Sequence, residues 1–183
     1  MFEELLIARK RSDGTSQSLC THSKNVAEIS ASISYYPNTS QLLAYLHDLG
    51  KASTDFQNYI IKEDGERGSV IHAWQGAFLA NELFPNDCAS AILLKEMIGF
   101  CVTAHHNHLD DGVAPDGTTD YFDKFLNTTA AKYSFDEIKG KISSREKAEF
   151  QTLFDHAKPE IFSLLAKIKE VYKDKNSANC HVP

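Results

Sequence analysis

Hydrophobic residues recur along most of the chain at spacings of three and four positions, which are typical of amphipathic helices. Val26, Ile29 and Ile33 form one such stripe, and Leu42, Leu43 and Leu46 lie close together in the next. The pattern predicts helices over 18–36, from about 40 to Gly50, and over 53–62, 70–84, 87–106, 143–157 and 159–175. No segment shows the alternation that is typical of a strand, so the sequence predicts an all-α fold.

Prolines, glycines and short polar residues mark the predicted helix ends. Pro37 ends the first helix, Thr39 or Ser40 caps the second, and Gly50 suits the left-handed position that follows a helix. Pro159 opens the last helix at its first turn. Segment 107–120 is rich in Asp and Gly, so it is predicted to be an irregular surface segment and the best candidate for a mobile lid.

The length and composition favour one globular domain over residues 1–183. The chain is 42% hydrophobic, which is enough to bury a sizeable core. There is no run of about 18 apolar residues and the amino terminus lacks the apolar core of a secretory signal, so we expect a cytoplasmic protein without a membrane span. The four cysteines form no CxxC pair and are predicted to be buried free thiols.

The net charge of -6 argues against a free-standing binder of duplex DNA, because clustered Lys and Arg normally supply most of the non-specific affinity for DNA. Two short basic groups, at 8–11 and 139–141, are interpreted as solvated faces rather than contact sites. Any nucleic acid must therefore be held locally or delivered by a partner.

Five of the eight histidines lie at or near predicted helix ends: His22, His47, His72, His105 and His106. The His47–Asp48 pair has two readings, a hydrogen bond that caps the helix end or a ligand pair for a metal ion. The His105–His106 doublet ends the most apolar helix, where two imidazoles need several polar partners to offset their desolvation. Five imidazoles and one carboxylate suit a divalent transition metal, which would act as a Lewis acid toward water and phosphate.

Four stretches carry a family resemblance. "HDLGKAS" resembles the signature of the HD metal-dependent phosphohydrolase superfamily. "THSKNVAE", "IHAWQGAFLA" and "TAHHNHL", in this order around it, resemble the HD nuclease domain of the CRISPR-associated type I effector nuclease-helicase. The resemblance covers residues 18–110 and implies an HD-domain helical bundle with its metal site at helix ends.

The resemblance also implies the ligands of two metal ions that share Asp48. His22 and His47 complete the first ligand set, and His72, His105 and His106 complete the second. The ions implied are divalent, one or two per chain, drawn from Mn, Ni, Co, Fe or Mg. Asp48 and Lys51 are the predicted catalytic residues, with Lys51 either polarising a phosphate or remaining a solvated lysine at a helix end.

The implied activity is cleavage of phosphodiester bonds in single-stranded DNA during CRISPR interference, an antiviral defence. The implied partners are a superfamily 2 helicase, in cis or in trans, and an RNA-guided CRISPR surveillance complex. Two alternatives stay open. One is a phosphohydrolase of nucleotides or cyclic nucleotides, and the other is a non-catalytic, metal-depleted HD interaction domain.

One feature departs from the family pattern. The family closes the first metal site with a late aspartate, in a context that here reads "FSLLAKIKE", with Lys167 and Lys169 where carboxylates are wanted. We expect that the chain stops before the true aspartate; otherwise the first site is incomplete. Asp110, Asp111 and Asp155 are possible substitutes, and each also fits an ordinary loop or surface acid.

Overall fold

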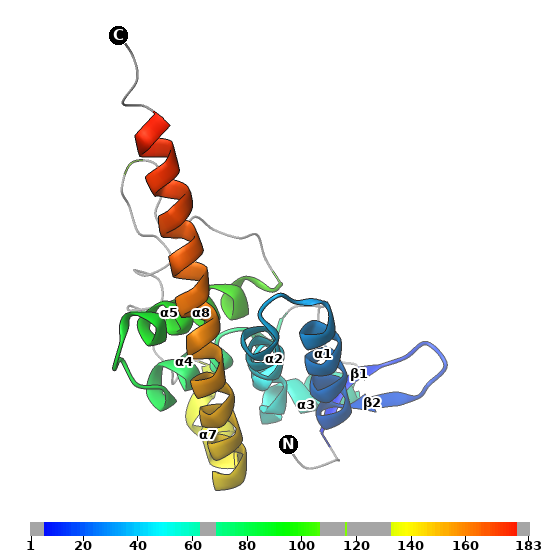
Figure 1. The fold of residues 1–183 in the computed structure, drawn as a ribbon. Helices are drawn as coiled ribbons and strands as arrows, with labels where there is room; N and C mark the ends of the chain where they lie inside the picture. The colour runs from blue at the N-terminus through cyan, green and yellow to red at the C-terminus, as the bar shows by residue number, and fades with distance from the viewer. Residues whose placement is uncertain (1–5, 63–68, 107–115, 117–132, 179–183) are drawn as a thin grey trace.

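The chain folds into a bundle of helices with one small hairpin (Figure 1). The computed structural model describes residues 6–62, 69–106, 116 and 133–178, with side chains described as far as residue 173. The elements are β1 (Ile7–Lys10), β2 (Ser16–Ser18), α1 (Leu19–Ile33), α2 (Pro37–Leu46), η1 (Leu49–Ala52), α3 (Thr54–Lys62), α4 (Gln75–Leu83), α5 (Ala89–Ala104), α7 (Phe135–Lys141) and α8 (Ser144–Ala178). The predicted all-α class is therefore confirmed.

The β1–β2 hairpin corrects the expectation that the chain contains no strands. The strands pair antiparallel, and the turn between them places Gly14 at a φ of 81°, a value that suits glycine. The Asp13 carboxylate accepts hydrogen bonds from the backbone and the hydroxyl of Thr15. Strands of four and three residues are too short to show a reliable alternation, so hydrophobic patterning did not reveal them. The hairpin projects from the bundle beside α1 (Figure 1).

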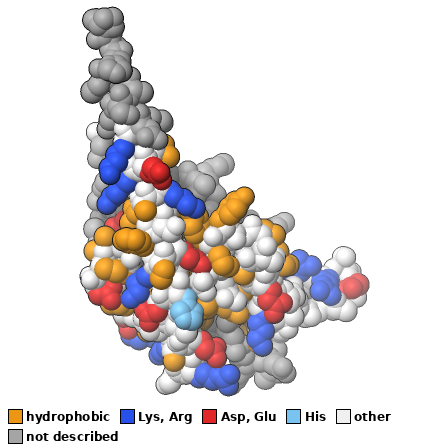
Figure 2. Space-filling view, viewed as in Figure 1, with side chains coloured by type: hydrophobic (Ala, Val, Ile, Leu, Met, Phe, Trp, Pro, Cys, Tyr) orange, Lys and Arg blue, Asp and Glu red, His pale blue; other side chains and the backbone are white. Residues whose placement is uncertain are grey.

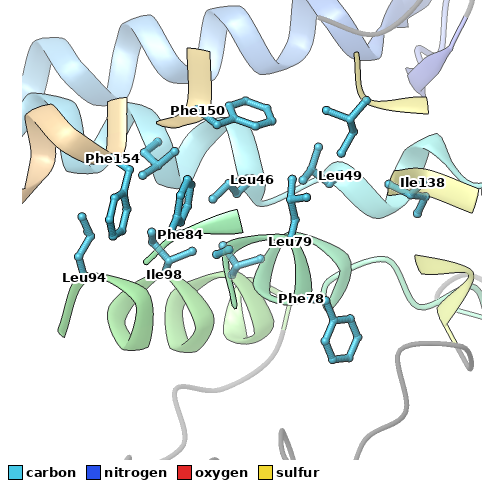
Figure 3. Close-up of a cluster of buried hydrophobic side chains, with 14 of the residues drawn as sticks. Leu46, Leu49, Phe78, Leu79, Phe84, Leu94, Ile98, Ile138, Phe150 and Phe154 are labelled. Atoms are coloured by element: carbon cyan, nitrogen blue, oxygen red, sulfur yellow. The ribbon is translucent and has the colours of Figure 1, made fainter. Parts of the chain in front are cut away.

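Helix α8 crosses α2 and α5 and closes the core. Phe150 and Phe154 point from α8 into the layer between these helices (Figure 3), and both are almost completely buried. The rings of Phe154 and Phe84 stack with centroids 4.2 Å apart. Burial of each such side chain contributes about 2 to 3 kcal/mol. This packing fixes α2, whose end carries the His47–Asp48 pair.

The start of α2 differs from the prediction. Pro37 lies in the first turn of α2 rather than ending α1, and Thr39 lies inside the helix. The cap comes from α8 instead. The carboxylate of Glu160 accepts hydrogen bonds from the backbone N–H groups of Asn38 and Thr39 and from both of their side chains. A distant carboxylate thus takes the place of the local cap that the sequence predicts.

The sequence predicts that Pro159 begins a separate helix, but this is wrong. Helix α8 runs through Pro159 without a break. Proline removes one helical hydrogen bond and normally breaks a helix at a cost of about 3 kcal/mol. Ala157 and Ile161 flank it and are completely buried against the core. Packing on both sides of the proline offsets its local cost, since most helical stability in proteins comes from tertiary contacts.

Three smaller expectations also have outcomes in the described residues. Helix α4 begins at Gln75 rather than near residue 70, so His72 lies in the segment before it. Cys20 is buried, but Cys88 and Cys101 are exposed, so the prediction of buried thiols is wrong for these two. None of the described helices has the length and hydropathy needed to cross a membrane. The predicted lid at 107–120 lies outside the described residues, except for residue 116.

Candidate metal centre

Asp48 lies at the point where α2 stops. His47 still donates its backbone N–H to the Leu43 carbonyl, whereas Asp48 leaves the helical conformation with φ -109° and ψ 16°. The one-turn helix η1 follows at once and carries Lys51. Because of this break, the Asp48 side chain turns into the bundle, where it is only 3% exposed.

Gly50 lets the chain before α4 approach Asp48. A Cβ atom at Gly50 would overlap the backbone oxygen of His72 and the Oε1 atom of Gln75. Gln75 is buried and donates its amide hydrogens to the carbonyls of Tyr133, at 2.9 Å, and Ile71, at 3.3 Å. The glycine and the glutamine therefore determine where His72 lies relative to Asp48.

The helix ends of α1, α2 and α5, the short helix η1 and the segment before α4 together bring the predicted side chains to the Asp48 carboxylate. His22 lies in the first turns of α1, which Ser18 caps, while His105 and His106 end α5. The Oδ2 atom of Asp48 lies near His22 Nε2 (3.0 Å), His47 Nε2 (3.1 Å) and Lys51 Nζ (2.8 Å). Its Oδ1 atom lies 3.4 Å from His105 Nε2 and 3.7 Å from His72 Nε2.

Backbone carbonyls orient three of the imidazoles. The Nδ1 atoms of His47, His72 and His105 lie 2.6, 3.1 and 2.6 Å from the carbonyl oxygens of Ala44, Val70 and Val102, respectively. In its neutral form, a ring that donates its Nδ1–H to a carbonyl carries the lone pair on Nε2, the nitrogen that faces Asp48. This is the arrangement that histidine ligands of metals adopt in proteins.

The unsatisfied atoms of the cluster fit a cation. Among the described residues, Asp48 Oδ1 and His105 Nε2 are buried without a hydrogen-bond partner. His72 Nε2 and His106 Nε2 lie 2.6 Å apart, so two ring nitrogens converge on one place. Buried acceptors without partners are costly, and a divalent ion among these four side chains would satisfy them together.

The donor atoms form two groups that could each hold a metal ion, with all atoms of a group within 4.8 Å of one another. Asp48 belongs to both groups. His22 and His47 complete one of them, and His72, His105 and His106 complete the other. These are the same two sets that the family resemblance implies.

The environment shifts several pKa values in the cluster. Burial opposes ionisation of Asp48, but the surrounding imidazoles hold the pKa of this carboxyl far below its usual range. Burial lowers the pKa of His72. Burial and the neighbouring His105 and His72 rings lower the pKa of His106 to about 4. Burial also opposes protonation of His47, but the hydrogen bond and charge of Asp48 outweigh it and raise its pKa. Neutral His72 and His106 are in the form that ligates metals.

The late carboxylate that the family pattern requires does not appear in the described part of this cluster. Asp155 lies on α8 and pairs with Lys158 at 2.9 Å, outside both donor groups. Asp110 and Asp111 lie outside the described residues. The sequence did not predict the positioning role of Gln75. The available signal was a polar residue at the start of a largely hydrophobic helix, next to Gly76.

Comparison with known proteins identifies the family. The family model described as HD domain matches residues 19–128, which contain all six side chains of the two donor groups. No curated protein and no solved structure matches the chain. HD domains are usually metal-dependent hydrolases that bind divalent metals, and this chain belongs to the HD domain family.

Proposed function

We propose that this chain is a metal-dependent phosphodiesterase that cleaves single-stranded DNA. The observation that carries the proposal is the convergence of five histidines, from separate segments, on one buried carboxylate. Their order along the chain resembles that of the HD nucleases of CRISPR interference. In this proposal the protein acts in the cytoplasm, beside a superfamily 2 helicase and an RNA-guided surveillance complex.

The protein side chains prepare the site for a cation and a phosphate. Asp48 and the Nε2 atoms of His72, His105 and His106 would hold a divalent ion, since they form the four-member donor group. A bound ion would supply Lewis acidity toward the phosphodiester. The carbonyl contacts at Nδ1 keep the His72 and His105 rings oriented, so little reorganisation is needed when the site is filled.

Lys51 supports the same chemistry from the other side of Asp48. Its ammonium lies 2.8 Å from Asp48 Oδ2, and its side chain is 14% exposed. A cation held in this way can donate hydrogen bonds to a phosphate oxygen as negative charge develops on it. The low pKa of Asp48 keeps its carboxylate ionised, and this carboxylate contacts Lys51 and belongs to both donor groups.

Single-stranded DNA as a delivered substrate agrees with the charge distribution. The chain carries a net charge of -6. On the face shown in Figure 2, Lys and Arg side chains are interspersed with Asp and Glu side chains rather than gathered into one basic patch. A surface of this kind gives little non-specific affinity for DNA, so a helicase that feeds the strand would supply most of the binding.

Cleavage of an end-labelled single strand tests the proposal. With Mn²⁺, Ni²⁺ or Co²⁺ present, we expect the wild-type chain to cut the strand, and we expect Asp48→Ala to lose at least about 100-fold in rate because both donor groups lose their shared ligand. Glu149→Gln is a matched control, because Glu149 is exposed and paired only with Arg145 in the described structure. Undiminished cutting by Asp48→Ala would refute the proposal.

A cavity favours a second candidate function, hydrolysis of nucleotides or cyclic nucleotides. It has a volume of about 580 Å³ and lies beside His72, since Val70 and Ile71 line it. Tyr59, Lys62 and Tyr133 also line it, and they could hold a base and a phosphate. A phosphate-release screen across mononucleotides, together with chromatographic detection of the monophosphate that forms when a cyclic nucleotide is opened, separates the two candidates. Turnover of one of these nucleotides at a rate above that of strand cleavage would favour the second candidate.

A further inference from the structure

The two halves of the centre are unequal, and the difference begins at the Asp48 carboxylate. Its Oδ2 atom already lies 2.8 Å from the Lys51 ammonium and 3.0 and 3.1 Å from the Nε2 atoms of His22 and His47. Its Oδ1 atom has no hydrogen-bond partner among the described residues, although it faces His72 and His105. A metal ion would relieve an unsatisfied acceptor only on the Oδ1 side.

The number of ligands differs in the same direction. The Oδ1 side offers four donors, because His72, His105 and His106 join Asp48. The Oδ2 side offers three, and one of them is the carboxylate that it must share. A transition metal held by protein ligands commonly takes at least three or four donors, so the Oδ1 side is the stronger of the two.

The charge of the centre also opposes a second ion. Asp48 is the single carboxylate in the two donor groups that the described residues form. Two divalent ions would therefore share one negative charge, in the presence of the Lys51 ammonium at the same oxygen. Repulsion between cations on one carboxylate is strong when the site is partly buried.

Lys51 is held in this place by its surroundings. Its carbonyl accepts a hydrogen bond of 2.7 Å from the Nε2 atom of Gln57, which is itself buried. Its ammonium lies 5.7 Å from the centre of the Phe56 ring, within the range of a cation–π contact. The side chain therefore loses little further freedom by staying at Asp48 Oδ2.

We propose that the Lys51 ammonium takes the place of a second metal ion on the His22–His47 side, so that the chain binds one divalent ion per molecule. The proposal rests on the metal-dependent function proposed above and gives it a more definite form. The single ion lies with Asp48, His72, His105 and His106, and Lys51 provides the second positive charge toward a phosphate. His22 and His47 then serve to position Asp48.

Isothermal titration of the full 183-residue chain with Mn²⁺ tests the proposal without an activity measurement. We expect one tightly bound ion in the wild type. Lys51→Met removes the positive charge and keeps an apolar side chain against Phe56. This variant should bind a second ion at least about tenfold more tightly than the wild type binds one. Lys51→Arg keeps the charge, so it should continue to bind one ion.

The outcomes separate this proposal from the proposed function. Two tightly bound ions in the wild type would overturn the role of Lys51 and leave a metal-dependent enzyme intact. No bound ion in any variant would overturn both. A single ion in Lys51→Met, or a second ion in Lys51→Arg, would overturn the charge argument. Circular dichroism verifies that each variant is folded. If Lys51→Met does not fold, Lys51→Gln replaces it. The number of ions that the wild type binds tests the proposal even without a variant.

Discussion

Gly50 lies where the turn after His47 meets the backbone of the segment that carries His72. A methyl group at this position would overlap the His72 carbonyl oxygen and Gln75 Oε1, and would come within 2.5 Å of the His72 Cα atom. Two of these three atoms belong to the backbone, so the chain before α4 must move away if Gly50 is replaced by alanine. The substitution thus separates His72 from Asp48 as well as straining the fold.

The expected magnitude follows from the clash. Overpacking of a tight interior costs about 1 to 3 kcal/mol, and a contact with backbone lies at the upper end, so we expect Gly50→Ala to lose about 3 kcal/mol. For a chain of this size the melting temperature falls by about 2 to 4 °C for each kcal/mol, which gives a fall of about 6 to 12 °C. Gly140 is the matched control, because it lies in α7 with no atom within 4 Å of an added Cβ. Gly140→Ala should raise the stability by about 0.5 to 1 kcal/mol.

Thermal unfolding of both variants, with and without Mn²⁺, is the assay. Gly50→Ala should melt below the wild type and gain less from Mn²⁺, because its four-donor group is displaced. Gly140→Ala should melt slightly above the wild type and gain the full amount from Mn²⁺. If Gly50→Ala melts at the wild-type temperature, the close approach of the two segments does not hold, and the explanation of how His72 reaches Asp48 is wrong.

Two further predictions concern pH and the start of α2. Folding lowers the pKa of His106 from 6.5 to about 4. As the pH falls from above 6.5 toward 4, the His106 side chain is protonated in the unfolded chain before it is protonated in the folded chain, so the stability of the fold decreases. The urea midpoint of the metal-free wild type should therefore fall more between pH 7 and pH 5 than that of His106→Ala; equal falls would contradict this. Glu160→Gln weakens the cap of α2, and it should lower the free energy of urea unfolding by about 1 to 3 kcal/mol. Glu149→Gln, at an exposed position, should change this free energy by less than about 0.5 kcal/mol. Equal losses in the two variants would contradict the capping role of Glu160.

Much of the helical framework and the composition of the centre could be predicted from the sequence. The His105–His106 doublet at the end of an apolar helix was a strong signal, since such a helix end needs polar partners. The His47–Asp48 pair was ambiguous. The structure shows the hydrogen bond at the helix end, and the metal-ligand interpretation stays a prediction. His47 bonds to a backbone carbonyl through Nδ1 and faces Asp48 through Nε2.

The features that the sequence did not predict depend on contacts between distant segments. Glu160 caps a helix that lies more than 120 positions earlier in the chain, and no local pattern at Thr39 indicates it. The helix runs through Pro159 because the residues on both sides of it are buried. The difference between the two sides of the centre also depends on such contacts. Lys51 lies at Oδ2 of Asp48 and His105 at Oδ1, and the sequence does not indicate which oxygen each residue contacts.

Anomalous diffraction from crystals soaked in Mn²⁺ tests the central claim most directly, because it locates the ion and its ligands together. The account predicts one strong peak, coordinated by Asp48 Oδ1 and by the Nε2 atoms of His72, His105 and His106, with Lys51 still at Oδ2. A centre without an ion, or an ion held by other residues while these imidazoles bond to one another, would contradict it.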